Sequence, residues 1–342
     1  HGNNKSQAEI ERAVDLGVGT IVIDSFVEIG RVADAARRLG KTQRVRLRVN
    51  SGVHAHTHSF LATAHEDQKF GVTIADAPAL VAEIRSHDSL EFVGLHCHIG
   101  SQIFGTDGFA ESAARLLTLH SELLKGGPVP ELNLGGGFGI AYTPADEPTP
   151  IEEIAQEIAS VVSAECARLG IDIPVICVEP GRAVIGTSTF TLYEVGTTKD
   201  VTVEVVNDNG AATGQTAVRK YVSVDGGMSD NARPALYGAD YSVRIANRVS
   251  DAEPALVRIA GKHCESGDIL VYADYLPGDV HPGDLLAIPA TGAYCWSLSS
   301  NYNYLTRPPV VAVKDGVARV IVRGETEEDL LARDMGVIRK AQ

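Results

Sequence analysis

The chain has 342 residues, enough for two domains of ordinary size, and its 44% hydrophobic and 22% charged residues are typical of a folded soluble protein. With 30 Lys and Arg against 44 Asp and Glu, the formal net charge is −14, which argues against nucleic acid or an anionic membrane as a partner because both require clustered positive charge. Five cysteines without a C-x-x-C pair argue against a disulfide framework and favour the reducing cytoplasm. No apolar run is long enough for a transmembrane helix.

Up to about residue 185, short β-branched segments alternate with amphipathic stretches, a pattern typical of strand–helix units and a parallel sheet. The predicted strands are Val18–Asp24, Val45–Val49, Phe92–His98, Leu132–Leu134 and Val175–Glu179. The predicted helices are Ser6–Leu16, Arg31–Leu39, Ala75–Ser86, Phe109–Leu124 and Ile151–Leu169.

After Arg182 the pattern changes to short alternating strands with turn residues between them, which predicts an all-β domain, a closed or Greek-key barrel. These strands are Tyr193–Val195, Val201–Val206, Lys220–Val224, Ala255–Ala260, Leu285–Ala287, Val310–Lys314 and Ala318–Arg323. We therefore expect a first domain over residues 1–187 and a second over residues 188–342.

The number of strand–helix units bears on the first domain. Five units are predicted, whereas a closed parallel barrel needs eight. At roughly 30 residues per unit, about three units, on the order of 90–100 residues, are then expected to precede His1. A smaller open sheet is the alternative. The opening on His1, without Met or a leading strand, favours a barrel that lacks its first strands.

A glycine run, Gly135, Gly136 and Gly137, directly follows the fourth predicted strand. Consecutive glycines leave backbone N–H groups able to face an anion, and in a strand–helix barrel the loop after a late strand often binds phosphate. The alternative is a tight turn. The run does not match G-x-x-x-x-G-K-[ST], which excludes a nucleotide-binding P-loop.

Two further strand ends carry polar residues. Glu179 and Arg182, in the motif E-P-G-R, form either a carboxylate and a guanidinium for a ligand or a local ion pair. His96 and His98 alternate on one strand and therefore face the same side, as metal ligands, as a stacking platform or as hydrogen-bonded core residues.

A metal site is not expected elsewhere. His54, His56 and His58 alternate within a histidine-rich loop that suits an active-site rim. No cysteine or spaced carboxylate completes a zinc site there, and H-E-x-x-H is absent.

A thiol and a carboxylate, Cys264 and Glu265, lie side by side in a glycine-flanked turn after Lys262 and His263. The neighbouring cations suit a reactive cysteine, whereas an ordinary polar turn is the alternative.

In this order, the motifs H-I-G-S-Q, L-G-G-G-F-G, E-P-G-R, D-G-G-M-S-D-N, H-C-E-S-G-D and G-A-Y resemble the fold-type III pyridoxal-phosphate-dependent decarboxylases over the whole chain. The opening H-G-N-N-K-S and the later A-R-P-A-L-Y resemble the members that act on diaminopimelate. The resemblance implies an α/β plus all-β protein, in which a pyridoxal-phosphate-binding (β/α)8 barrel without its first strands precedes a Greek-key β-barrel domain. It also implies decarboxylation of meso-2,6-diaminopimelate to L-lysine and CO2, the last step of lysine biosynthesis, in a cytoplasmic homodimer with active sites at the subunit interface.

The resemblance further implies roles at the cofactor, pyridoxal 5'-phosphate. His98 would stack on its pyridine ring, and an ionised Glu179 would keep the ring nitrogen protonated. The other cofactor-binding residues would be Ser101, Gly135, Gly136, Gly137, Gly181, Arg182 and Tyr294.

For the substrate, the distal carboxylate would be bound by guanidinium groups, which are planar and suit this task better than an ammonium. Glu265 of the partner subunit would contact the distal amino group, and the partner's Cys264 would reprotonate the carbanion. Together with His98, these two are the predicted catalytic residues. The predicted substrate-binding residues are Arg182, Arg233, Tyr237, Glu265 and Tyr294.

Other functions remain open. Ornithine- or arginine-type decarboxylases, and more distantly carboxynorspermidine decarboxylase, belong to the same family. Ornithine-type enzymes bind an aliphatic diamine tail and need carboxylates at the far end of the pocket, whereas the second amino-carboxylate centre of diaminopimelate needs cations as well as an anion. Arg182, Arg233 and Glu265 suit that requirement. The remaining alternative is a non-catalytic homologue or fragment that acts as a binding protein.

One family feature is absent. The family attaches its cofactor covalently to a lysine in a Y-A-x-K-A-N segment, and neither Lys5 nor Lys69 lies in such a segment. We therefore expect these 342 residues alone to be inactive and poorly stable.

Overall fold

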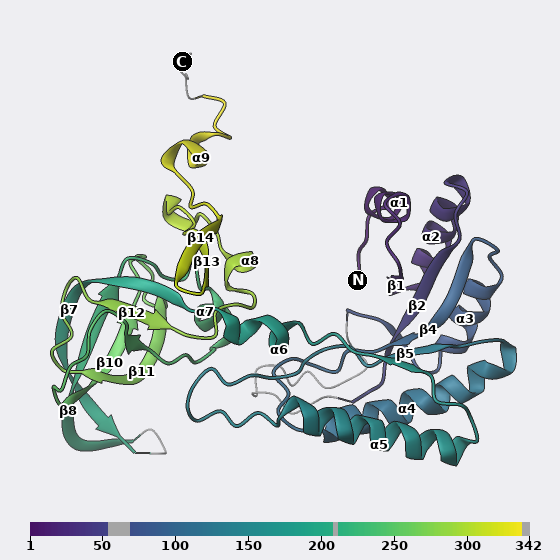
Figure 1. The fold of residues 1–342 in the computed structure, drawn as a ribbon, viewed down its shortest axis with the longest axis horizontal. Helices are drawn as coiled ribbons and strands as arrows, with labels where there is room; N and C mark the ends of the chain where they lie inside the picture. Colours follow the sequence, from purple (N-terminus) through teal and green to yellow (C-terminus); the bar gives the residue numbers. More distant parts are fainter. Residues whose placement is uncertain (54–68, 208–210, 337–342) are drawn as a thin grey trace. The chain divides into compact units, whose positions relative to one another are not determined.

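The computed structural model describes residues 1–53, 69–207 and 211–336, which fall into two units (Figure 1). The first unit comprises residues 1–140 and 147–183, and the second comprises residues 141–146 and 184–342. The predicted rim histidines, at positions 54, 56 and 58, lie outside the described residues.

The first unit contains a parallel sheet whose strands pair in chain order, β1-β2-β4-β5-β6, with the short β3 on β2. Its strands are β1 (Ile21–Ile23), β2 (Gln43–Asn50), β3 (Val72–Thr73), β4 (Leu90–His96), β5 (Glu131–Asn133) and β6 (Val175–Cys177). Its helices are α1 (Gln7–Asp15), α2 (Phe26–Arg38), α3 (Ala77–Arg85), α4 (Asp107–Leu123) and α5 (Ile151–Leu169). The five predicted parallel strands are confirmed. Among the described strands, β1 and β6 end the sheet and do not pair with each other.

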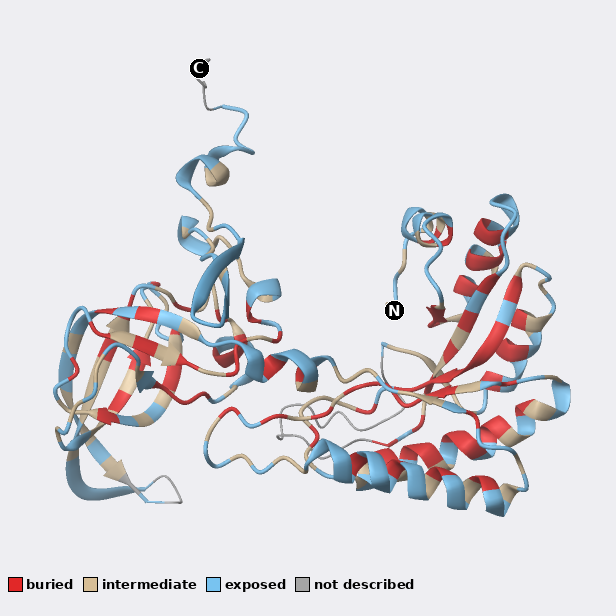
Figure 2. Cartoon of the chain, in the orientation of Figure 1, coloured by how far each residue is buried: buried red, intermediate tan, exposed pale blue. Residues whose placement is uncertain are grey.

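The two faces of this sheet differ in polarity. On β2, Val45, Leu47 and Val49 are at most 1% exposed and belong to the apolar core, whereas Arg46 and Arg48 alternate with them and face the other side. Burying such an aliphatic side chain contributes about 1.5–3 kcal/mol. In Figure 2, α4 and α5 likewise carry buried residues along one side and exposed residues along the other. The helices therefore cover the apolar face of the sheet, and the polar side chains of β2 lie on the other face.

Two strands of this unit end two residues earlier than predicted. β4 ends at His96 rather than His98, and β6 ends at Cys177 rather than Glu179. In the sequence, the alternation of apolar and polar residues continues beyond the last residue that is paired with a neighbouring strand. The pattern therefore predicts strands that are too long. The residues beyond each strand form the loops that carry His98 and Glu179.

The second unit has a six-stranded sheet of order β11-β10-β8-β7-β12-β9, antiparallel except where β10 pairs with β8. Its strands are β7 (Thr191–Val206), β8 (Ala212–Val224), β9 (Arg244–Ile245), β10 (Pro254–Ala260), β11 (Ile269–Pro277) and β12 (Leu285–Ile288), followed by the hairpin of β13 (Val310–Lys314) and β14 (Val317–Val322). Its short helices are α7 (Arg233–Tyr237), α8 (Cys295–Leu298) and α9 (Glu327–Leu331), and α6 (Gly181–Ile185) begins in the first unit and ends in the second. An α/β unit followed by an all-β unit confirms the predicted fold class.

The strand prediction in the second unit was wrong in two places. Tyr193–Val195 and Val201–Val206 belong to one strand, β7, since the polar stretch between them stays paired with β8 and Gly196 only shifts the register. β9 and β11 were not predicted. No helix among the described residues is long and apolar enough to cross a membrane.

Candidate active site

The carboxyl ends of three neighbouring parallel strands bring polar side chains together in the first unit. His96 is the last residue of β4, Asn133 is the last of β5, and Glu179 follows β6 by two residues. Ligand sites form at such strand ends, because the loops of adjacent strands meet there.

Glu179 is held as an anion by three donors. Its Oε1 lies 3.0 Å from His1 Nε2 and accepts a 2.9 Å hydrogen bond from Asn133 Nδ2, and its Oε2 lies 3.4 Å from His96 Nε2. Burial disfavours the charged carboxylate, but the hydrogen bonds from His1 and His96 outweigh this effect and hold the pKa of Glu179 well below its usual range. The site therefore presents a fixed negative charge at neutral pH.

Burial favours the neutral form of both histidines of the motif, because it lowers the pKa of each ring. His96 is 1% exposed, and its Nε2 lies 3.4 Å from Oε2 of Glu179, where a carboxylate oxygen can accept a hydrogen bond from the tautomer that carries its proton on Nε2. His98 accepts a 3.2 Å hydrogen bond at Nδ1 from Gly136 N, and burial together with the nearby Arg48 lowers its pKa. The ring of His98 is thereby oriented by the glycine loop.

The glycine run allows the strand-end loops to approach one another closely. A Cβ on Gly136 would lie 2.3 Å from Glu179 O, one on Gly137 would lie 2.4 Å from Gly100 O, and one on Gly135 would meet a backbone carbonyl at 2.2 Å. Real Cβ contacts are never this short. Close backbone packing is thus one reason for three successive glycines.

Part of the expected anion-binding capacity is used within the chain. Gly135 N donates to Asn133 Oδ1 at 2.8 Å, and Gly136 N donates to His98 Nδ1 at 3.2 Å. Gly137 N makes no hydrogen bond to the residues that the structure describes. Of the three amides, only that of Gly137 is therefore without a hydrogen-bond partner among the described residues.

The E-P-G-R motif reaches the same edge of the sheet. Arg182 is 8% exposed and donates from Nη2 to Ser101 Oγ at 2.9 Å. Gly181 N donates to Glu179 O at 2.9 Å and begins α6. Both residues were predicted to contact the cofactor, and the structure places them with the glycine loop in the first unit.

His1, Asn133 and Arg48 were missed as members of this site. Asn133 lies inside a predicted apolar strand, and a polar residue in such a strand was the available signal. The group His1, His96 and Glu179 also has donor atoms suited to a metal, all within 4.8 Å of one another. Since each histidine faces the carboxylate at hydrogen-bonding distance, hydrogen bonds account for this arrangement.

Lys5 is held by contacts within the first unit. Its Nζ lies 2.9 Å from Glu28 Oε1 and donates to Gly2 O at 2.6 Å and to Val22 O at 2.9 Å. The ammonium group is thus occupied in fixing the opening turn to β1 and α2.

In the second unit, Asp268 joins two of the motifs. This carboxylate is 2% exposed and accepts from Met228 N at 2.6 Å and from His263 N at 2.8 Å. Lys262 N also donates to Gly226 O at 3.0 Å. D-G-G-M-S-D-N and H-C-E-S-G-D therefore form one loop cluster.

Arg233 lies among tyrosines. It is 7% exposed, its guanidinium carbon lies 4.4 Å from the ring centre of Tyr142 and 6.0 Å from that of Tyr294, and its Nη1 donates to the Tyr241 hydroxyl at 2.5 Å. Burial raises the pKa of Tyr241, which keeps that phenol neutral. Tyr237, in the same short helix as Arg233, is 59% exposed.

Cys264 and Glu265 contact each other. The Cys264 Sγ lies 3.5 and 3.6 Å from the two carboxylate oxygens of Glu265, and the Tyr302 hydroxyl donates to Oε1 of the same carboxylate. The hydrogen bond from Tyr302 is the main cause that lowers the pKa of Glu265. The predicted site residues thus form two groups, one in each unit.

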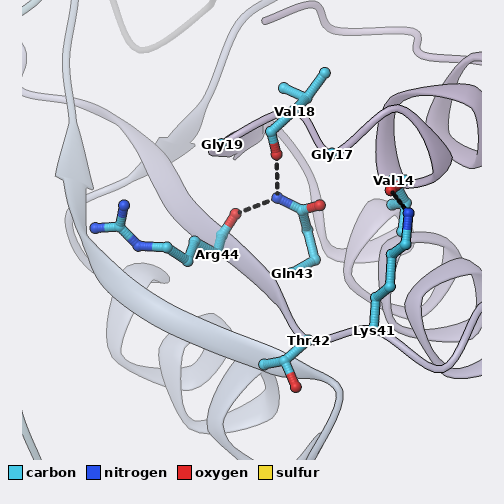
Figure 3. A pocket seen from close by; sticks show the side chains of 8 residues that line it. All are labelled: Val14, Gly17, Val18, Gly19, Lys41, Thr42, Gln43 and Arg44. Atoms are coloured by element: carbon cyan, nitrogen blue, oxygen red, sulfur yellow. Dashed lines mark hydrogen bonds between the residues drawn. The ribbon is translucent and has the colours of Figure 1, made fainter.

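A hollow of about 330 Å³ lies elsewhere, at the amino end of β2 (Figure 3). Its polar groups bind one another, since Lys41 Nζ donates to Val14 O at 2.9 Å and Gln43 Nε2 donates to Val18 O at 3.0 Å. Because it lies at the opposite end of the strands from the motifs, we assign no ligand to it.

Comparison with known proteins identifies the family. Residues 1–186 match the pyridoxal-dependent decarboxylase, pyridoxal binding domain, and residues 182–292 match the pyridoxal-dependent decarboxylase, C-terminal sheet domain. The diaminopimelate decarboxylase of Mycobacterium tuberculosis is 51% identical over 98% of this chain and 74% of its own length. That of Bacillus subtilis is 42% identical over the same shares.

Solved structures agree. The diaminopimelate decarboxylase of M. jannaschii in co-complex with L-lysine superposes with a TM-score of 0.85 at 30% identity, over 98% of this chain and 73% of that one. The Helicobacter pylori enzyme complexed with L-lysine has a TM-score of 0.82 at 29% identity, over 96% and 76%. A lysine/ornithine decarboxylase of Vibrio vulnificus, 19% identical with a TM-score of 0.68, shares the fold. The chain therefore belongs to the pyridoxal-dependent decarboxylases and, within them, to the diaminopimelate decarboxylases.

Proposed function

We propose that this protein decarboxylates meso-2,6-diaminopimelate to L-lysine and CO2 with pyridoxal 5'-phosphate as its cofactor, the last step of lysine biosynthesis. The observation that carries the proposal is Glu179, a carboxylate kept ionised by His1, Asn133 and His96 beside the glycine loop. Such a fixed anion suits a protonated pyridine nitrogen.

The residues around Glu179 fit this cofactor. His98 offers a neutral ring oriented by Gly136, which suits stacking on a pyridine. Gly137 N and the guanidinium of Arg182, already bonded to Ser101, suit the phosphate. When bound, the cofactor supplies an electron sink for the pair released on loss of CO2.

The other residues bind the substrate and manage its proton. Arg233, whose guanidinium carbon lies 4.4 Å from the ring centre of Tyr142 and 6.0 Å from that of Tyr294, binds the distal carboxylate, and Tyr237 and Tyr294 are further substrate-binding residues of the second unit. At the other end of the substrate, the bond between the reacting carboxylate and its α-carbon breaks, CO2 leaves, and this α-carbon gains a proton.

The proton source is assigned to a thiol. Cys264 Sγ is exposed beside the carboxylate of Glu265, which suits a donor to the carbon and a contact for the distal ammonium. In this proposal both residues act from the partner subunit of a homodimer.

Product analysis tests the proposal. The protein carrying this sequence, supplied with pyridoxal 5'-phosphate, is offered meso-diaminopimelate, ornithine and arginine separately. We expect CO2 and L-lysine from the first alone. Release of CO2 from ornithine or arginine instead would favour the ornithine/arginine-type alternative, and bound cofactor without CO2 from any of the three would favour a binding protein.

A further inference from the structure

The loop cluster of the second unit includes a third segment, which follows α8. Ser300 N donates to Ser229 O at 2.8 Å, so this segment is fixed to the D-G-G-M-S-D-N loop. Asp268 fixes the turn with Cys264 and Glu265 to the same loop. The segment and the turn are therefore held against each other by a common neighbour.

Tyr302, in this segment, reaches Glu265 directly. Its hydroxyl donates to Glu265 Oε1, and its ring centre lies 5.3 Å from that of His263. Because the Cys264 thiol lies within 3.6 Å of both carboxylate oxygens, a hydroxyl and a thiol together fix this carboxylate.

The backbone beside Tyr302 adopts an unfavourable conformation. Asn303 has φ 52° and ψ 27°, and Tyr304 has φ 60°, both in the left-handed region. Two successive residues with a Cβ rarely adopt it unless their surroundings require it. Here it turns Asn303 towards the same site, where Nδ2 lies 3.7 Å from Cys264 Sγ and 3.4 Å from His263 Nδ1.

We propose that Tyr302 is a positioning residue, whose hydroxyl holds the Glu265 carboxylate in the orientation that receives the distal ammonium group of the substrate. This inference rests on the proposed function, which gives Glu265 that contact. A free carboxylate loses rotational freedom when it binds a ligand, whereas one that is held in advance does not. Because the distal end of the substrate takes no part in bond breaking, the effect falls on KM rather than on kcat.

Tyr302→Phe tests this in the cofactor-loaded protein, since it keeps the ring beside His263 and removes only the hydroxyl. We expect KM for meso-diaminopimelate to rise about fivefold, the effect of one net hydrogen bond, with kcat unchanged. Tyr304→Phe is the matched control, because Tyr304 is 74% exposed and its hydroxyl bonds to none of the residues that the structure describes. An unchanged KM in Tyr302→Phe, or the same rise in both variants, overturns the proposal.

A carboxyl titration gives a readout that does not depend on turnover. In cofactor-free protein labelled with 13C at glutamate side-chain carboxyls, Glu265→Gln assigns the resonance of Glu265. Since the Tyr302 hydroxyl lowers the pKa of Glu265, we expect its midpoint to move to higher pH in Tyr302→Phe and to stay in place in Tyr304→Phe.

The two readouts separate the two proposals. If the unsubstituted protein releases no CO2 from diaminopimelate, the proposed function fails. Normal release with a Glu265 midpoint that does not move in Tyr302→Phe overturns only the role of Tyr302.

Discussion

Gly136 gives the sharpest prediction for the candidate site, because its neighbours leave no room for a side chain. In Gly136→Ala the new Cβ would stand 2.3 Å from Glu179 O and 3.3 Å from Glu179 C. Ordinary contacts lie at about 3.5–4.0 Å, so the two loops must separate by about 1 Å. Such overpacking costs about 1–3 kcal/mol. The separation also moves Glu179 away from its donors and His98 away from Gly136 N.

Gly30→Ala is the matched control. Gly30 lies inside α2, and a Cβ there meets no atom within 4 Å. Alanine in a helix interior is favoured over glycine by about 0.5–1 kcal/mol, so this variant is expected to gain stability. The same chemical change is thus predicted to act in opposite directions at two positions.

Two measurements check this prediction. Urea unfolding followed by far-UV circular dichroism reports mainly on the helices of the first unit, and a cofactor titration gives Kd. For Gly136→Ala we expect a loss of about 1–3 kcal/mol and at least about tenfold weaker cofactor binding. Equal stability and equal Kd in Gly136→Ala and the unsubstituted protein would show that the close approach of the loops does not shape the site.

Three further substitutions test single contacts. His96→Phe removes a donor to Glu179, so the pKa of Glu179 is expected to rise. When cofactor binding is titrated at decreasing pH, this variant is expected to lose the cofactor at a higher pH than the unsubstituted protein does. Burial raises the pKa of Asp230 to about 6 from 3.8, so the stability that this carboxyl contributes is full below about pH 4 and is lost as the pH rises through 6. Asp230→Asn is expected to remove about 2 kcal/mol of the difference in unfolding free energy between pH 4.5 and pH 7, measured by urea unfolding. Arg233→Lys loses the planar contact with Tyr142, and KM is expected to rise about tenfold or more in steady-state assays.

The sequence predicted the first unit well because its strands are short β-branched runs between amphipathic helices. Each of the five parallel strands is recovered, although β4 and β6 end two residues early. The second unit was harder to predict. Gly196 and its polar neighbours have the composition of a turn, yet pairing with β8 continues across them, and this depends on a partner strand that local sequence does not reveal.

The candidate site was predictable where motifs follow strands. Glu179, the glycine run and His98 do lie together at one edge of the sheet. The residues that support them were not predicted, because His1 and Asn133 are far from Glu179 in the sequence and contact it only in the folded chain. Tyr302 was missed for the same reason, since it lies in an exposed segment without periodicity and meets Glu265 only after folding.

The central claim is that the ionised Glu179 supports decarboxylation of diaminopimelate. It is tested most directly by measuring the rate of CO2 release from carboxyl-labelled meso-diaminopimelate by the unsubstituted protein and by Glu179→Gln, at matched cofactor occupancy. Glutamine keeps the shape and removes the charge, so we predict a rate lower by about 100-fold or more. A Glu179→Gln protein that releases CO2 at the unsubstituted rate would contradict the account.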